Sequence, residues 1–228
     1  MIICLEEIKE MPTPASEIAL KNLRDLSTLQ WYVIPLLAIV LYIYSSEIKK
    51  ARQTGVWDAI YAGLTIFGMD FINETWNGWV FYLTQYSACW TTPGCTALQT
   101  MVGWNIEIMF MFAISGIIFY NTLSDDREDR ILGIPNRWFW AMGYSVFCVF
   151  VECILNMGGH LVWEYTWWNR SFAGVWLIFL IGYFHFFVAV IFVLSLKTDK
   201  AKIITIACIY SVAVLANVIC MGFLGWVY

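Results

Sequence analysis

Charged residues are scarce in this chain. Asp, Glu, Lys and Arg make up 13% of its 228 residues, whereas hydrophobic residues make up 61%. This balance excludes a soluble globular domain and is typical of a polytopic membrane protein. The 13 Lys and Arg residues occur in short clusters between apolar runs, and the formal net charge is -4. Because no basic face forms, the sequence predicts no nucleic-acid partner.

Several catalytic and cofactor-binding patterns are also missing. Only two histidines occur, which argues against a multi-histidine metal site and against haem held by paired histidines. No Ser-His-Asp or G-x-S-x-G pattern indicates nucleophilic catalysis, and no Lys within an apolar run could form a retinal Schiff base. A mixed metal site is conceivable because two of its ligands would be one helical turn apart. Its members would be Asp70, Glu152, His160 and Glu164. We expect no metal and no other cofactor.

Six apolar runs are long enough to cross about 30 Å of hydrocarbon as helices. They lie near residues 30–46, 57–84, 100–123, 138–158, 173–196 and 203–227. The sequence therefore predicts an all-α, polytopic membrane helix bundle with about six transmembrane helices. The fourth helix could continue past Gly159.

Basic residues predict how the bundle sits in the membrane. Nine of the 13 follow the first, third and fifth runs: Lys49, Lys50, Arg52, Arg127, Arg130, Arg137, Lys197, Lys200 and Lys202. Since cytoplasmic loops carry an excess of Lys and Arg, both termini are expected on the non-cytoplasmic side.

Residues 1–29 are predicted to form an N-terminal segment, and residues 30–228 a single transmembrane bundle. The opening MIICLEEIKEM has neither a basic region nor a long apolar region, so we expect no cleavable signal peptide. A short amphipathic helix is expected from Thr13 to Leu29, with Thr13 as its cap and Pro14 in its first position. It would be a surface helix at the lipid interface or a lid over a site.

Polar side chains inside the apolar runs are the strongest indication of a functional site. An intramembrane charge costs roughly 2.5 to 3.5 kcal/mol on insertion scales, so such groups normally face a protein interior or a wet cavity. Asp70, Asn73, Glu74 and Asn77 share one stripe of the second helix. Most of these groups fall in the non-cytoplasmic half of the membrane, which favours a pocket that opens outward or sideways into the outer leaflet.

The fourth helix carries a second polar stripe. Ser145, Cys148, Glu152, Asn156 and His160 align on it, and Glu164 would follow if the helix continued. His185 and Asn217 fall near mid-membrane in the fifth and sixth helices. For a lone polar group of this kind, a satisfied interhelical hydrogen bond is the simpler interpretation.

Two carboxyl groups one turn apart in a low dielectric resist joint ionisation, which leaves a proton donor available. We therefore predict acid-base chemistry. Glu74 or Asp70 would donate the proton, Glu107 or Glu152 would stabilise positive charge, and His160 or Glu164 would act as the terminal base. The expected substrate-binding residues are Asn73, Trp76, Asn77, Trp104, Asn156, Trp163, His185 and Asn217. Indole faces could stabilise a cation, although Trp163 to Trp168 also fit an interfacial aromatic belt.

Fragments of the chain resemble two families of membrane enzymes. FINETWNGW at 71–79, Asn105-Ile106-Glu107 and Gly158-Gly159-His160 look like successive helices of the emopamil-binding sterol isomerases. Asn73 with Trp76, and Trp163 with Glu164, are similar to elements of small membrane-bound terpene cyclases. Asp70 stands where the isomerases have His, and Asn77 where the cyclases have Glu. Both resemblances imply acid-initiated carbocation chemistry on an isoprenoid.

The prediction is thus a membrane-embedded enzyme that acts on a lipid or isoprenoid by cyclisation or isomerisation. A proton- or cation-coupled transporter and a non-catalytic lipid- or amphiphile-binding protein stay open as alternatives. Cys89 and Cys95 share one non-cytoplasmic loop and could form a disulfide there, and Asn169 begins a glycosylation sequon on the same side.

Overall fold

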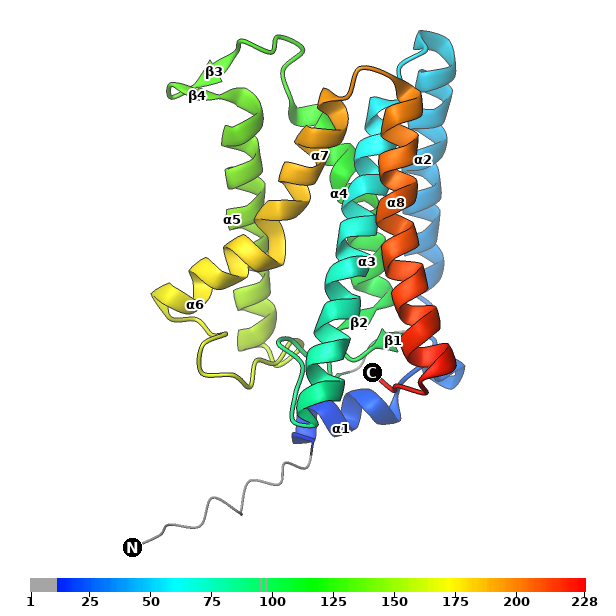
Figure 1. The fold of residues 1–228 in the computed structure, drawn as a ribbon, viewed down its shortest axis with the longest axis vertical. Helices are drawn as coiled ribbons and strands as arrows, with labels where there is room; N and C mark the ends of the chain where they lie inside the picture. Colours follow the sequence, from blue (N-terminus) through cyan, green and yellow to red (C-terminus); the bar gives the residue numbers. More distant parts are fainter. Residues whose placement is uncertain (1–11, 95, 97) are drawn as a thin grey trace, which may run out of the picture.

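A computed structural model describes residues 12–94, 96 and 98–228, and helices dominate it (Figure 1). Its long helical segments match the six predicted runs. The first four are α2 (Val33–Thr54), α3 (Asp58–Thr84), α4 (Ile106–Thr122) and α5 (Asn136–Met157). The fifth is continuous through α6 (Phe172–Leu177), η2 (Ile178–Phe184) and α7 (His185–Ser195), and the sixth consists of α8 (Asp199–Asn217) and η3 (Val218–Phe223). By length and composition, Asn136–Met157, Phe172–Ser195 and Asp199–Phe223 are able to cross a membrane. The α4 helix is apolar but shorter, and α2 and α3 carry more polar side chains. The prediction of an all-α membrane bundle is confirmed.

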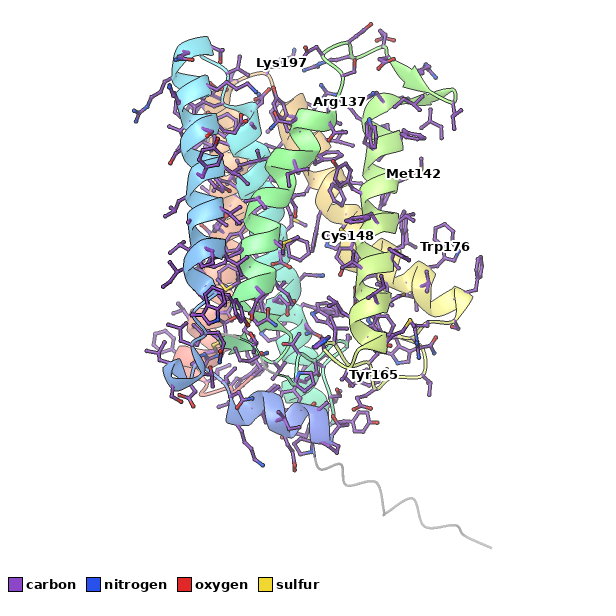
Figure 2. All side chains as sticks on the ribbon, turned by 180° about the vertical axis from the view of Figure 1, so that it is seen from behind. Arg137, Met142, Cys148, Tyr165, Trp176 and Lys197 are labelled. Atoms are coloured by element: carbon purple, nitrogen blue, oxygen red, sulfur yellow. The ribbon has the colours of Figure 1, made fainter. Side chains whose placement is uncertain are left out.

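The bundle has two chemically different ends. The α2–α3 turn, the β3–β4 hairpin and the α7–α8 turn lie at one end, whereas α1 and the C-terminus lie at the other (Figure 1). Figure 2 places Arg137 and Lys197 at the first end and Tyr165 at the second. The basic clusters are therefore gathered at one end, as the sequence suggests. Which side of the membrane that end faces stays a prediction.

Two short hairpins interrupt the helical pattern. Strands β1 (Gln99–Met101) and β2 (Trp104–Asn105) pair ahead of α4, and β3 (Arg130–Ile131) pairs with β4 (Ile134–Pro135) ahead of α5. The third helix consequently begins at Ile106 and not near residue 100. Asn105 fixes this start, because its side-chain oxygen accepts a hydrogen bond from the amide of Ile108 at 3.0 Å.

The fourth helix ends where the predicted run ends, and the alternative in which it continues past Gly159 is wrong. Helix α5 ends at Met157, and Gly159 takes a left-handed conformation with φ +73°. Glycine adopts this conformation without steric cost, so it turns the chain away from the helix axis. His160 and Glu164 therefore lie in a loop and do not extend the polar stripe of α5.

The N-terminal helix is shorter than predicted. Helix α1 (Pro14–Lys21) begins as expected, with Thr13 as its cap and Pro14 in the first position. It ends before Asn22, and Arg24 has φ +59°, so the chain turns before the short η1 (Leu26–Thr28). One continuous helix to Leu29 is therefore wrong.

Helix α3 is the centre of the bundle, because it packs against α4, α7 and α8. It approaches α4 closely at Gly116, where an added Cβ would lie 2.1 Å from the carbonyl oxygen of Ala62. Small residues of this kind allow membrane helices to pack closely. Around the contact, Ile66, Phe119 and Phe186 form part of a fully buried core.

Helix α5 stands apart from this central group (Figure 1). It packs mainly on η2 and touches α4 over only a short stretch. Helices α4 and α5 thus make few contacts with each other, and the candidate site lies between them.

Candidate functional site

A cavity of about 450 Å³ lies between α3, α4, α5 and α7. This volume is within the range of small-molecule sites. Its polar residues gather on α3 and α5 and at the start of α4, and its apolar residues follow α4 and α5. The polar lining consists of Asp70, Asn73, Glu74, Glu107, Glu152 and Tyr183, together with Ser115 and Tyr144.

Three buried carboxylates line the cavity. Asp70 and Glu74 are each 3% exposed and come from successive turns of α3, while Glu152 is 4% exposed and comes from α5. No Lys or Arg lines the cavity among the described residues. These carboxylates therefore have no basic partner there.

Each carboxylate instead receives a hydrogen bond from a tryptophan indole. Trp104 donates to Asp70 at 2.8 Å and Trp90 donates to Glu74 at 2.8 Å. Trp163 donates to Glu152 at 3.0 Å, and Tyr183 also interacts with the Glu152 carboxylate. A buried polar group needs such partners, since leaving it unsatisfied costs about 1–3 kcal/mol. Each indole donor satisfies one carboxylate oxygen and leaves the negative charge of an ionised carboxylate in place, whereas the second oxygen of Glu74 is buried without a hydrogen bond among the described residues.

Asn77 positions one of these indoles. It follows Glu74 on the same stripe of α3, and its side chain reaches the loop at 89–90. The Asn77 amide oxygen accepts from the backbone nitrogen of Cys89 at 2.8 Å and from that of Trp90 at 3.2 Å, and its amide nitrogen donates to the carbonyl of Trp90 at 2.8 Å. Asn77 therefore anchors the loop that places Trp90 on Glu74.

The cavity wall opposite α3 is irregular. Segment η2 is a π-helical stretch, and it contributes Gly182 and Tyr183 to the cavity. Asn73 of α3 donates a hydrogen bond to the carbonyl of Gly182 at 3.4 Å. Single π turns inside helices occur frequently at functional sites. Here the π turn brings Tyr183 beside Glu152.

The apolar part of the cavity reaches the outer surface between α4 and α5. Met111 of α4 and Phe147 of α5 both line it, and each is 61% exposed. Ile118 and Val151 also line this part and are exposed. Figure 2 shows Cys148, another lining residue, on the side of α5 that is turned toward the bundle.

A family model described as "Uncharacterized membrane protein family" matches residues 13–222. The chain belongs to this family. A relative from Archaeoglobus fulgidus, an "Uncharacterized protein", is 43% identical over 217 residues, which cover 95% of this chain and 100% of the relative. No solved structure matches the chain.

Membership of this family corrects the resemblances seen in the sequence. The match spans nearly the whole chain, and neither it nor the archaeal relative points to a sterol isomerase or a terpene cyclase. Assignment to those enzymes is wrong. The fragments at Asn73 with Trp76 and at Trp163 with Glu164 are too short to carry it, and Glu164 lies in a loop. The family does establish that the chain is an integral, multi-pass membrane protein.

The structure places the predicted site residues in three groups. The first group lines the cavity: Asp70, Asn73, Glu74, Glu107 and Glu152. The second supports it without lining it: Trp104 and Trp163 as indole donors, Asn77 as the loop anchor, and Trp76, whose ring lies 6.0 Å from that of Trp90. The third does not line it: Asn156, His160, Glu164, His185 and Asn217.

Members of the third group have other contacts. Asn217 donates to Thr75 at 2.6 Å and accepts from the Tyr228 hydroxyl at 2.9 Å, which matches the alternative of an interhelical bond. His185 contacts the carbonyl of Leu180, and Asn156 donates to the carbonyl of Leu161. Among the described residues, no group of three or more His, Cys, Asp or Glu side chains could hold a metal ion.

Sequence reasoning missed Trp90 and Tyr183 of the cavity lining, and it placed Trp168 in an aromatic run that also fits an interfacial belt. Trp90 and Trp168 lie in loops, where no helical periodicity relates them to α3, and their rings stack at 5.6 Å. Tyr183 lies in a nearly uniform apolar run. Its polar hydroxyl within that run is the only signal that could have indicated it.

The structure describes only one of the two cysteines in the predicted disulfide. Cys95 lies outside the described residues, so its pairing with Cys89 stays a prediction. Cys89 is fully buried, and this burial raises the pKa of its thiol to about 12. A thiol in such surroundings is chemically inert when it is reduced.

Proposed function

We propose that this membrane protein binds an amphiphilic lipid, which enters its cavity sideways from the bilayer between α4 and α5. The observation that carries the proposal is the contrast between the buried and the exposed residues of the cavity. Asp70, Glu74 and Glu152 are buried, whereas exposed apolar side chains of α4 and α5 line the opening. A lipid tail fits the opening and a polar head group fits the buried acidic side.

The chemistry of the buried acidic side favours a particular kind of head group. Ionised carboxylates accept hydrogen bonds and do not donate them. With no Lys or Arg in the lining, an anionic head would be repelled, whereas an amine or a hydroxyl group would be held. Trp90, Trp168 and Tyr183 add aromatic surface, which attracts cations.

The test compares two amphiphiles with the same fluorescent C16 tail, one with an ammonium head and one with a sulfate head. The purified protein in lipid nanodiscs is expected to bind the ammonium compound at least tenfold more tightly. Glu74→Gln and Glu152→Gln should each weaken this binding by about tenfold, which corresponds to about 1.4 kcal/mol. Glu128→Gln, a change in an exposed loop, is the matched control. Equal binding of the two amphiphiles would refute the proposed head-group preference, and absence of both from the cavity would refute lipid binding.

A second candidate function is acid-base turnover of the bound lipid. It is favoured by Asp70 and Glu74, which lie one helical turn apart, are both buried, and have no basic neighbour in the cavity lining. Such a pair resists carrying two charges, so one member can hold a proton and donate it to the ligand. Glu152 would then accept a proton from the other side.

Turnover is tested by extracting the lipids that copurify and comparing them by mass spectrometry before and after incubation with fresh protein. Conversion of one lipid species by the wild type is expected, with loss of conversion in Asp70→Asn or Glu74→Gln. Stable binding without any conversion would leave the protein as a lipid-binding protein and would refute the enzymatic function.

A further inference from the structure

A second, smaller cavity of about 190 Å³ adjoins the large one. Its wall comes from the loop at 92–96, the start of α4 and the loop after α5. Its polar lining residues are Thr92, Thr96, Asn105, Glu107 and His160. His160 is exposed, so this outer cavity reaches the molecular surface. The start of α4, which contributes to its lining, lies at the end of the bundle that holds α1 and the C-terminus (Figure 1).

The two cavities share part of their lining. Ile108, Leu155 and Leu161, together with Glu107, border both of them. These side chains form a collar: three aliphatic groups and one carboxylate separate the outer cavity from the chamber of Asp70, Glu74 and Glu152. Because the same side chains border both cavities, a single layer of side chains lies between them.

Glu107 is held in place at this collar. The Tyr32 hydroxyl donates to its Oε1 at 2.6 Å, and the Thr96 hydroxyl donates to its Oε2 at 2.6 Å. Tyr32 precedes α2 and Thr96 lies in the loop before β1, so separate segments of the chain fix one carboxylate. Its position suits a polar relay between the surface and the buried carboxylates.

We propose that the outer cavity is an aqueous entrance, through which water and hydrated protons reach the carboxylate chamber past Glu107. The bilayer opening between α4 and α5 then admits the lipid, and the end of the bundle admits water. Intramembrane carboxylates commonly mark such proton and ion routes. This inference depends only on the two cavities, so it would survive a failure of the lipid-binding proposal.

Cysteine accessibility tests the route. In protein whose seven native cysteines are replaced by alanine, Leu155→Cys places a thiol in the collar, and Ile154→Cys places one at the same depth on the exposed surface of α5. A charged, membrane-impermeant methanethiosulfonate is added to proteoliposomes. It is expected to label Leu155→Cys at least tenfold faster than Ile154→Cys, and only from the side that carries the C-terminus. Equal rates, or labelling only from the opposite side, would overturn the proposal.

A second measurement probes the chamber itself. With Cys148 restored as the sole thiol, the same reagent is expected to label it from the C-terminal side. Leu155→Phe should lower the rate at least tenfold by filling the collar, whereas Ile154→Phe should not change it. If Leu155→Phe has no effect, or if Cys148 reacts only with a membrane-permeant reagent, the chamber is reached through the bilayer opening and the aqueous entrance is refuted.

Discussion

Tryptophan indoles are the principal partners of the buried acids at the scale of single residues. Asp70, Glu74 and Glu152 each accept one indole N–H, and the three donors come from three different parts of the chain. Helical spacing predicted that Asp70 and Glu74 share a face, because that relation is local. It could not predict Trp90 as the partner of Glu74, because the contact depends on how a loop folds back onto α3.

Trp90→Phe is expected to destabilise the protein by about 1–3 kcal/mol, because it keeps most of the ring packing but leaves the Glu74 carboxylate without its indole donor. Equilibrium unfolding in mixed micelles measures the change. Trp31→Phe, at an exposed position, should change stability by less than about 0.5 kcal/mol. In a Glu74→Leu background the loss caused by Trp90→Phe should largely vanish, since the acceptor is gone. An undiminished loss in that background would show that ring packing, and not the hydrogen bond, is what Trp90 contributes.

At the scale of elements, the sequence predicts the helices better than their ends. Apolar length defines each helix, and the described residues contain a helical segment for every predicted run. The start of α4 was misplaced, because a β hairpin delays the helix inside sequence that is still apolar. The end of α5 agrees with the predicted run, and the left-handed Gly159 rules out the longer helix. This matters for the site, since His160 and Glu164 leave the helix there and do not join Glu152.

Close packing of α3 on α4 yields a prediction at the same scale. Gly116→Leu should separate these two helices, because even a Cβ would meet the backbone of Ala62 at 2.1 Å, and we expect a loss of at least about 3 kcal/mol or failure to fold. The measurement is the yield and thermal stability of protein in detergent. Gly143→Leu in α5 is the control, because its added Cβ meets nothing closer than 3.9 Å and its position is exposed. Similar losses in both variants would contradict a specific contact at Gly116.

The whole molecule consists of a close-packed group formed by α2, α3, α4 and α8, with α5 held beside it through η2 and α7. The cavity lies between these parts, so its carboxylates come from both α3 and α5. Sequence patterns place one polar stripe on α3 and another on α5, but the distance between the two stripes depends on tertiary packing. This is why the polar residues of α3 and α5 could be named beforehand, whereas the π turn of η2, the collar and the opening toward the bilayer could not.

The opening between α4 and α5 supplies the last prediction. Ile118 and Phe147 line the cavity from these two helices, and both are exposed. In the double variant Ile118→Cys with Phe147→Cys, built without native cysteines, a bifunctional thiol reagent should tie the helices together across the opening. Uptake of the ammonium amphiphile should then slow at least tenfold, because a lipid can no longer pass sideways between α4 and α5. Stopped-flow fluorescence measures the rate, and a monofunctional reagent of similar size controls for the bulk of the adducts. Unchanged uptake after complete cross-linking would mean that the ligand enters elsewhere. The collar at Leu155 would then be the route to test, because it lies between the chamber and the outer cavity.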